Sequence, residues 1–371
     1  MNILFLSELF YPHGGGAELA TFLYAKLLSS AGFSVVVVTN RFSGEQEFSN
    51  SDGFAVYRLP LFEKEENVKY SILKRVDVLL SVFMRKLLRW ADVVYVPRFW
   101  FSAIPLAKAL GKPVITHLHD YIPICPLAIR YDIVRTGVCE NRRHCYLNCI
   151  FAYERRKRNL TKTISSAFLN TTIWFFLRES IKLSDAIICV SNAQRNILQE
   201  FLPSIASRLK VIYNPLPELS QIAIEGDHFG YFGGLSFSKG FHVLFKAMSY
   251  RRRPRSESVI VHCTKFHVLS PGLGELFRKA GFLVYGKLGR REYDRVYRMI
   301  KAVIVPSVWH EPLPYVVTES ALRGRIIIAS NIGGIPELVN GCRGVFLFDA
   351  GDAVQLAERI RYVSGLSRES G

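Results

Sequence analysis

Short apolar runs alternate with helix-like segments along the whole chain, and this alternation limits the fold more than any other feature. The first two runs, Ile3–Ser7 and Val35–Thr39, flank a helical pattern over Glu18–Ser30 that ends at Gly32. Runs this short and this apolar are typical of strands that are buried on both faces. Because helices separate them, they predict parallel βαβ units with right-handed crossovers.

The alternation forms two series, and a proline-rich break separates them. Asn214-Pro215-Leu216-Pro217 and a polar stretch through Asp227 follow the first series, so we expect a domain boundary there. The predicted fold is α/β, with one doubly wound Rossmann-like domain at 1–215 and another at 216–371. The ligand is expected in a cleft at the carboxyl ends of the strands. Further strands are expected at Val93–Val96, Val114–Leu118, Ala186–Val190, Leu209–Tyr213, Phe229–Phe232, Ser258–His262, Phe282–Tyr285, Ala302–Val305, Ile326–Ala329 and Val345–Phe348.

Composition narrows the class of partner. The 371 residues are 49% hydrophobic and 21% charged, which supports large cores and excludes bulk disorder. A net charge of +17 favours nucleotides or an anionic membrane surface, whereas the aromatic and basic signature of a nucleic-acid binder is missing. The chain has no uninterrupted stretch of about 18 apolar residues, which is the length that a membrane-spanning helix needs. Its first residues have the pattern of a strand and not that of a signal peptide. We therefore expect a cytoplasmic protein or one peripheral on the cytoplasmic membrane face.

The positive charge is concentrated in residues 74–162, which hold 17 Lys and Arg against 6 Asp and Glu. A helix predicted over Lys74–Trp90 gathers apolar residues on one face and basic residues on the other, which is typical of attachment to anionic lipid. The alternative is a crossover helix that packs on the core and has a solvated basic face. Thr163–Leu177 is apolar enough to cover an acceptor pocket or to enter an interface, but it is too short to span a membrane.

A glycine-rich segment joins the first predicted strand to the first helix. In Pro12-His13-Gly14-Gly15-Gly16-Ala17-Glu18 the glycines allow close backbone approach, and the N–H groups at the helix start can hold an anion. The spacing is not GxGxxG, and no acidic residue follows at the distance that a ribose requires. A tight turn without a ligand is the alternative.

Two glutamates follow the predicted strand Ala302–Val305. Glu311 lies in a loop, and Glu319 lies on the next helix. Carboxylates placed in this way can accept hydrogen bonds from a sugar and from a ribose, while the N–H groups at the helix start bind a diphosphate between them. Lys239, which also lies between a strand and a helix, can offset the repulsion between these carboxylates and a diphosphate. Two solvated surface charges are the alternative.

Taken in order, these segments resemble the retaining glycosyltransferases of the GT-B fold in family 4, also called glycosyl transferases group 1. The resemblance covers nearly the whole chain. It rests on Pro12–Glu18, His119-Asp120, Val211-Ile212-Tyr213-Asn214-Pro215, Phe232-Gly233-Gly234-Leu235 with Lys239-Gly240, Glu311–Glu319, and Ser330-Asn331-Ile332-Gly333-Gly334-Ile335-Pro336-Glu337.

The resemblance implies a hexosyltransferase of glycan biosynthesis. Its C-terminal half would bind a nucleotide-diphosphate sugar, and its N-terminal half a glycan or lipid-linked acceptor. The implied chemistry is front-face retention, in which the leaving phosphate helps to deprotonate the acceptor and no metal or other cofactor is required. The implied catalytic residues are His119, Glu311 and Lys239. The implied donor-binding residues are Gly15 and Gly16 over the phosphates, Lys239 with Leu313, Pro314, Tyr315 and Val316 at the diphosphate, Glu311 at the sugar and Glu319 at the ribose.

Two positions depart from the family pattern. Gly234 stands where an arginine is common, which leaves Lys239 as the close cation of that loop. Pro314 stands where a glycine is common and removes one N–H donor from the helix start. Phosphate binding would then depend on Tyr315, Val316 and later amides.

Three histidines lie near these segments. His119 is expected to approach the transferred sugar, because Asp120 follows it as in the family. His117 is expected to point to the opposite side. In the alternative without a functional role, one of these two histidines satisfies a core hydrogen bond and the other is solvated. His310 stands beside Glu311 and is a further candidate for a contact with the donor sugar.

Four of the seven cysteines, Cys125, Cys139, Cys145 and Cys149, fall in the loop 121–150, which we assign to the N-terminal domain. A structural zinc would order a loop of this length, and His144 lies among the four. Because paired CxxC motifs are missing, disulfides and free thiols stay open as alternatives. The other three cysteines are expected in the core.

Three functions fit these patterns. The first is a glycosyltransferase that works at the membrane surface on a lipid-linked acceptor. The second is a soluble transferase for a polysaccharide or small-molecule acceptor. The third is a nucleotide-sugar epimerase of the same architecture, which would need no acceptor.

Overall fold

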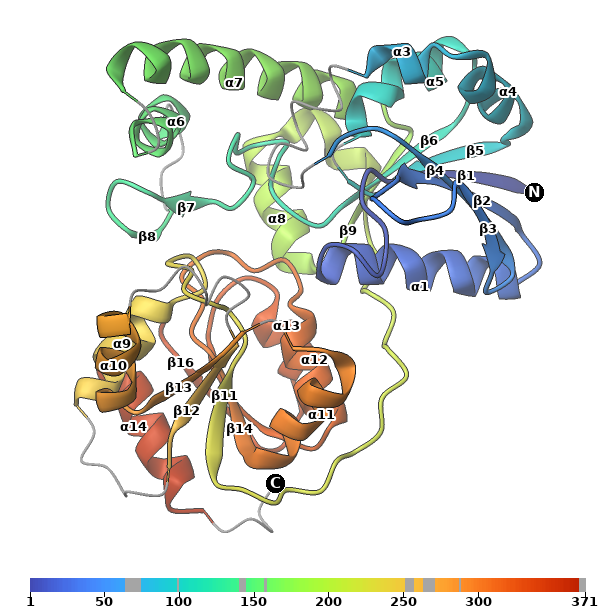
Figure 1. The fold of residues 1–371 in the computed structure, drawn as a ribbon. Helices are drawn as coiled ribbons and strands as arrows, with labels where there is room; N and C mark the ends of the chain where they lie inside the picture. The colour runs from blue at the N-terminus through green and yellow to red at the C-terminus, as the bar shows by residue number, and fades with distance from the viewer. Residues whose placement is uncertain are drawn as a thin grey trace. The chain divides into compact units, whose positions relative to one another are not determined.

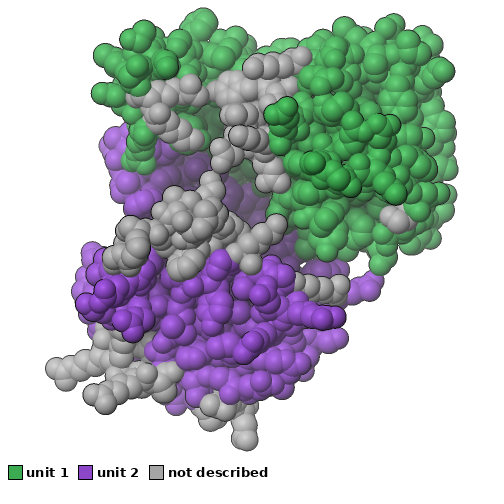
Figure 2. Space-filling view, viewed as in Figure 1, with its two compact units in different colours: residues 1–128, 142–215 green, residues 129–141, 216–371 purple. Residues whose placement is uncertain are grey.

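The chain folds into two compact units, coloured green and purple in Figure 2. The computed structural model describes residues 1–63, 75–98, 100–139, 145–156, 159–250, 257–262, 271–286 and 288–366. Unit 1 comprises residues 1–128 and 142–215, and unit 2 comprises residues 129–141 and 216–371. Both are α/β units built on a parallel sheet, which confirms the predicted fold class.

Unit 1 contains an eight-stranded sheet in the order β10-β9-β6-β5-β1-β2-β4-β3. All neighbours are parallel except β3 and β4, which form an antiparallel pair at one edge. This pair was not predicted, since its residues mix polar and apolar types and β3 lies at the solvent edge. The strands are β1 (Asn2–Leu6), β2 (Ser34–Asn40), β3 (Phe48–Ser51), β4 (Phe54–Leu59), β5 (Val93–Val96), β6 (Val114–Leu118), β9 (Ala186–Cys189) and β10 (Leu209–Val211).

The helix expected over Lys74–Trp90 is not continuous in the part that the structure describes. The chain forms α3 (Val76–Leu79) and α4 (Val82–Trp90) instead. Ser81 interrupts the helix with an extended backbone, and its Oγ accepts a hydrogen bond from the Met84 N–H at 3.2 Å, which caps α4. The interruption also changes the buried face: Met84 and Leu88 are buried, whereas Leu80, Phe83 and Trp90 are exposed.

The remaining helices of unit 1 cover the sheet and extend beyond it. They are α1 (Gly16–Ser30), α5 (Ile104–Ala109), α6 (Cys145–Arg155), α7 (Leu160–Ile181) and α8 (Asn192–Phe201). None of the helices in the described ranges is both long and apolar enough to cross a bilayer.

Unit 2 contains a six-stranded parallel sheet in the order β13-β12-β11-β14-β15-β16. Helices α11, α12 and α13 lie on one face, and α9, α10 and α14 lie on the other (Figure 1). The central strand β14 is buried along its whole length. The elements are β11 (His228–Tyr231), β12 (Val259–His262), β13 (Phe282–Tyr285), β14 (Ile300–Val305), β15 (Ile326–Ser330), β16 (Val345–Phe348), α9 (Phe241–Ser249), α10 (Pro271–Lys279), α11 (Arg290–Met299), α12 (Tyr315–Leu322), α13 (Ile335–Val339) and α14 (Ala353–Ser364).

A small hairpin of the cysteine-rich loop belongs to unit 2. We expected all of 121–150 in the N-terminal domain, whereas residues 129–141 form part of unit 2. The hairpin consists of β7 (Tyr131–Asp132) and β8 (Gly137–Val138), and Val138 packs against the core of unit 2.

Strand pairing in unit 2 brings two loops together. β11 lies next to β14, and parallel strands end at the same edge of a sheet. The loop after β11, which contains Lys239, is therefore adjacent to the loop after β14, which contains Glu311. A backbone contact joins the loops, because the Val308 N–H donates to the Ser238 carbonyl at 2.9 Å.

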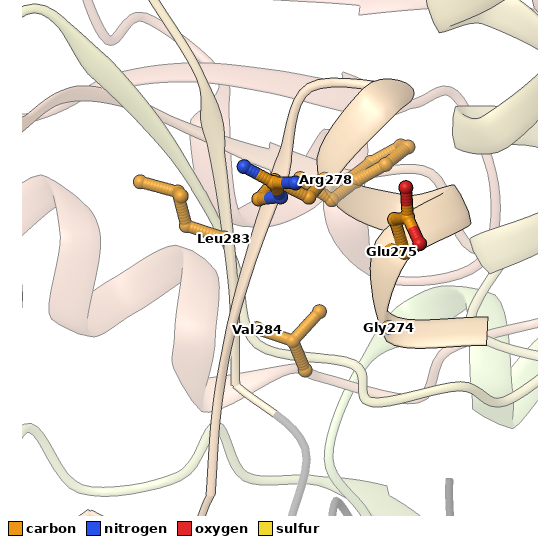
Figure 3. A pocket seen from close by; sticks show the side chains of 6 residues that line it. Gly274, Glu275, Arg278, Leu283 and Val284 are labelled. Carbon is orange, nitrogen blue, oxygen red and sulfur yellow. The ribbon is translucent and has the colours of Figure 1, made fainter. Parts of the chain in front are cut away.

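A pocket of about 420 Å³ lies between α10 and β13 (Figure 3). Its charged side chains are Glu275 and Arg278, and Glu275 is paired with Lys279 at 2.8 Å. The pocket flanks the last strand of the sheet, so we assign it no part in the site described below.

Gly240 is the residue whose replacement tests the packing of these loops. It has φ +78°, and a Cβ there would lie 1.6 Å from the Pro306 carbonyl oxygen. Gly341 has nearly the same φ, +76°, but open space around it. We expect Gly341→Ala to lower the free energy of unfolding by about 1–2 kcal/mol.

Gly240→Ala should cost at least about 2 kcal/mol more than Gly341→Ala, because the Pro306 backbone must also move. Chemical unfolding of both variants measures the difference. Equal losses would show that the loop does not depend on this close approach.

Candidate functional site

Lys239 and Glu311 form an ion pair at the carboxyl edge of the unit 2 sheet. Lys239 Nζ lies 2.6 Å from Glu311 Oε1, and the Ser307 hydroxyl donates to the same oxygen at 2.7 Å. Glu311 is 3% exposed, whereas the Lys239 side chain is 39% exposed and its ammonium lies 5.0 Å from the Trp309 ring centroid. The structure therefore brings together two predicted residues and adds Ser307, which was not among the predicted site residues.

The backbone at Glu311 depends on a glycine from another loop. Gly333 has φ +60°, and a Cβ there would lie 2.2 Å from the Glu311 carbonyl oxygen. The Gly334 N–H donates to that carbonyl at 2.8 Å. Both glycines follow β15, which pairs with β14, so the sheet order also fixes this contact.

Helix α12 begins beside this pair. Pro314 stands at the cap position with φ −79° and ψ 119°, and its carbonyl accepts from the Val317 N–H at 3.1 Å. Proline supplies no N–H at the cap, so the amides of the first turn begin with Tyr315 and Val316. Leu313 precedes the cap and is half-buried.

Glu319 lies further along α12, and its electrostatic neighbours differ from those of Glu311. Burial raises the pKa of Glu319, while Arg323, one turn later, opposes the shift. Burial, together with the negative charge of Glu319, also raises the pKa of Tyr297 to about 12. Arg323 stacks over the Tyr297 ring at 4.3 Å and donates to Asp294 Oδ1 at 2.6 Å. Glu319 thus has an aromatic and cationic surrounding of its own.

In unit 1 the glycine-rich loop is held by Glu18. The Gly15 N–H donates to Glu18 Oε2 at 2.6 Å, and α1 begins at the next residue, Gly16. Gly14 has φ +87°, and a Cβ there would meet the Glu18 carboxylate. The amide of Gly15, which was expected to hold an anion, already has a carboxylate partner.

Arg98 pairs with this carboxylate and with a second one. The Arg98 guanidinium pairs with Glu18, and its Nε donates to Glu8 Oε1 at 3.1 Å. Glu8 and Glu18 are both buried, and Asp120 adds a third negative charge near Arg98. This network was not predicted, because its members follow three different strands and no short motif joins them.

His117 and His119 stack on each other, with ring centroids 4.4 Å apart. The expectation that they point to opposite sides is wrong, because residues two apart on a strand share a face. His117 Nδ1 is hydrogen-bonded to the Tyr95 hydroxyl, as expected for a core histidine. Burial and the positive charge of Arg98 lower the pKa of His119 to about 3, so its imidazole is neutral at pH 7.

His310 is held by the hairpin that belongs to unit 2. Burial and the charge of Arg130 lower its pKa to about 4, against an opposing hydrogen bond to the Cys139 backbone. The Arg130 guanidinium also donates to the Cys139 carbonyl at 3.1 Å. His310 is therefore a neutral group that contacts this hairpin.

The cysteine cluster stays a prediction. The side chain of Cys145 and all of His144 lie outside the described residues. Among the side chains that are described, no group of three or more His, Cys, Asp or Glu is arranged to hold a metal. Cys189 is buried as expected, Cys342 is exposed and the expectation for it is wrong, and Cys263 lies outside the described residues.

The neutral His119 predicts a pH-dependent stability. The unfolded chain protonates a histidine near pH 6.5, whereas His119 in the folded protein stays neutral down to about pH 3. The unfolded state thus binds more protons below pH 6.5, and the free energy of unfolding falls as the pH drops.

His119→Asn should reduce the slope of this fall by up to about 1.4 kcal/mol per pH unit. Urea unfolding of both proteins between about pH 6 and pH 4 measures the slopes. Identical slopes would show that His119 takes up its proton in the folded state.

Comparisons with known proteins agree with this architecture. The sequence model of Glycosyltransferase Family 4 matches residues 14–217, and that of Glycosyl transferases group 1 matches residues 226–364. A Klebsiella pneumoniae protein, described as an uncharacterized 42.6 kDa protein in the cps region, is 23% identical over 349 residues, which are 91% of this chain and 87% of the relative.

Two solved structures show the same fold. Sucrose-phosphate synthase from Thermosynechococcus elongatus has a TM-score of 0.69 at 15% identity, and the match covers 100% of this chain and 93% of that chain. Anabaena Alr3699/HepE in complex with UDP-glucose has a TM-score of 0.56 at 18% identity, with coverage of 98% and 89%. Because the first family model spans more than half of the chain, the protein belongs to Glycosyltransferase Family 4 and is a glycosyltransferase of the GT-B fold.

Proposed function

We propose that the protein moves a hexosyl group, with retention, from a nucleotide-diphosphate sugar to a lipid-linked glycan acceptor at the cytoplasmic membrane surface. The observation that carries the donor half of this proposal is the Lys239–Glu311 pair at the carboxyl edge of the unit 2 sheet. Ligands of open α/β sheets bind at this edge.

In this pair the carboxylate binds the donor sugar and the ammonium binds the diphosphate. The two hydrogen bonds that described side chains donate to the Glu311 carboxylate, from Lys239 and from Ser307, reach Oε1, which leaves Oε2 for a hydroxyl of the donor sugar. The Lys239 ammonium is partly exposed and stabilises the charge that develops on the leaving diphosphate. The amides of Tyr315 and Val316, at the positive end of α12, add donors for the same group.

Glu319 is the proposed partner of the ribose. Its raised pKa reflects a carboxylate that has lost part of its hydration, and hydroxyl donors replace that water. A nucleoside-diphosphate donor also fits the relatives, because Alr3699/HepE was solved in complex with UDP and with UDP-glucose. The panel of nucleotide sugars described below identifies the base and the sugar of this chain's own donor.

Unit 1 contributes Gly15, Gly16 and His119 in this proposal. A neutral His119 exchanges hydrogen bonds with the transferred sugar and adds no charge to the phosphates. Because Gly15 and Gly16 have no side chains, their backbone can approach the phosphates closely. The ion pair between Arg98 and Glu18 fixes the loop that contains them. The leaving phosphate takes the acceptor proton, so neither a carboxylate nucleophile nor a metal is assigned a step.

The acceptor is proposed to be a glycan precursor. The Klebsiella relative comes from a cps region, which supports a role in polysaccharide synthesis. A structural zinc on Cys125, Cys139, Cys145 and Cys149 is retained as a separate proposal, since thiolates are preferred zinc ligands. Metal analysis of the purified protein tests it.

Lys239→Met tests the electrostatic role. Loss of the ammonium should lower kcat by about a hundredfold, because a positioned donor to a developing anion contributes that much. Lys246→Met is the matched control, since Lys246 lies exposed on α9 seven residues later. Turnover of the Lys239 variant at the rate of the control would refute the assignment.

A panel of nucleotide sugars tests the donor class. The true donor should raise the melting temperature of the protein, and Glu319→Gln should weaken that rise. Proton NMR of the donor incubated without an acceptor then separates two reactions. A donor that stays unchanged supports transfer, whereas its conversion to an epimer would show the epimerase alternative to be correct.

A further inference from the structure

Helix α7 is apolar on two sides, and the described part of unit 1 covers only one of them. On the covered side Trp174, Leu177 and Ile181 are buried, and the Trp174 indole N–H donates to the Ile122 carbonyl at 2.6 Å. The other side carries an exposed line of large apolar residues. We call this line the α7 ridge; it consists of Leu160, Ile164, Phe168 and Phe175.

The α7 ridge runs along one face of the helix, and threonines occupy the turn between Phe168 and Phe175. Its members are spaced by four, four and seven residues, which places them on one face. Phe168 is 76% exposed, Ile164 is 58% exposed and Phe175 is 54% exposed. Leu169 and Phe176 widen the exposed apolar surface on the adjacent face. Such a contiguous apolar surface marks an interaction site.

The exposed part of α7 also lacks charge. No charged residue stands between Lys162 and Arg178. The hydroxyl of Thr172 donates to the Phe168 carbonyl at 3.0 Å, and that of Ser165 donates to the Lys162 carbonyl at 3.2 Å. Because these polar groups are satisfied within the helix, the face can enter a medium that offers no hydrogen bonds.

Positive charges border the ridge. Lys162 lies in the first turn of α7, and Arg155 and Arg156, which end α6 and directly follow it, are exposed. They belong to the segment 74–162, whose Lys and Arg outnumber Asp and Glu by 17 to 6. An apolar line with a basic border matches the acyl chains and headgroups of an anionic bilayer.

A second exposed apolar group lies toward the same edge of unit 1. Val76 and Leu80, at α3, are exposed, and Figure 1 shows α3 and α7 both along the upper edge of unit 1. Arg85 and Lys86 follow on α4 and are exposed as well. Helix α1 runs along the opposite edge.

We propose that the α7 ridge inserts into the boundary between headgroups and acyl chains of an anionic membrane, with Lys162, Arg155 and Arg156 at the phosphates. The inference rests on the proposed function only in taking the bilayer as the source of the acceptor. It assigns α7, rather than the basic helix expected over Lys74–Trp90, as the main apolar anchor.

Flotation with vesicles tests the proposal. Vesicles of phosphatidylcholine with phosphatidylglycerol should carry the full-length protein upward at moderate salt, and vesicles of phosphatidylcholine alone should carry less. The double variant Phe168→Ser with Phe175→Ser should lose about tenfold or more of the affinity for anionic vesicles. Leu27→Ser, which alters an exposed leucine on α1, is the matched control and should float like the parent.

A fluorescent reporter separates insertion from surface attraction. The Phe168→Trp variant should shift its emission to the blue when anionic vesicles are added, and brominated lipid should quench it. Equal flotation of the double variant and the parent, or an unshifted emission spectrum of the Phe168→Trp variant, would overturn the proposal. The proposal would also be overturned if the parent protein self-associated in the absence of vesicles and the double variant did not, because the ridge would then join two copies of the chain. Nucleotide-sugar thermal shifts on the same variants report donor binding independently.

Discussion

The carboxylate of Glu311 is the constraint on which the donor half of the protein depends. A buried carboxylate needs compensating partners, and leaving one unpaired costs several kcal/mol, about 3–5 in measured cases. Ser307 and Lys239 supply these partners, and they converge because β14 lies next to β11 in the sheet. The pairing also explains why the loops need glycines at Gly240 and Gly333, where a side chain would collide with the backbone.

Unit 1 also contains buried carboxylates that need a positively charged partner. Two buried carboxylates, Glu8 and Glu18, share the guanidinium of Arg98. Glu18 in turn fixes the amide of Gly15, so the conformation of the glycine-rich loop depends on an arginine that follows a different strand. Charge balance links the loop to His119 as well, because Arg98 disfavours the protonated imidazole. Both units thus hold their loops through ion pairs of buried carboxylates near the carboxyl ends of strands.

The regular parts of the fold could be predicted from the sequence, because buried parallel strands have short and nearly uninterrupted apolar runs. The strands Val93–Val96 and Phe282–Tyr285 have the predicted limits. Irregular parts were missed where a single side chain decides the outcome. Ser81 caps a new helix inside an amphipathic pattern, and the pattern alone gives no sign of the interruption.

The same distinction holds for the candidate site. Lys239, Glu311 and Glu319 were predicted from their position between strands and helices and from the family resemblance. Arg98 and Ser307 were not, because their roles depend on strand order, which local sequence does not encode. The exposed apolar side of α7 could not be predicted either, since the sequence shows an apolar segment but not which side the sheet covers.

Lysine labelling offers the most direct test that the Lys239–Glu311 edge binds the donor diphosphate. An amine-reactive reagent is applied with and without a saturating nucleoside diphosphate, and mass spectrometry measures the modification of each lysine. The nucleotide should protect Lys239 strongly and leave the exposed Lys246 unchanged. If a nucleotide that stabilises the protein leaves the labelling of Lys239 unaltered, the diphosphate binds elsewhere and the account of the site is wrong.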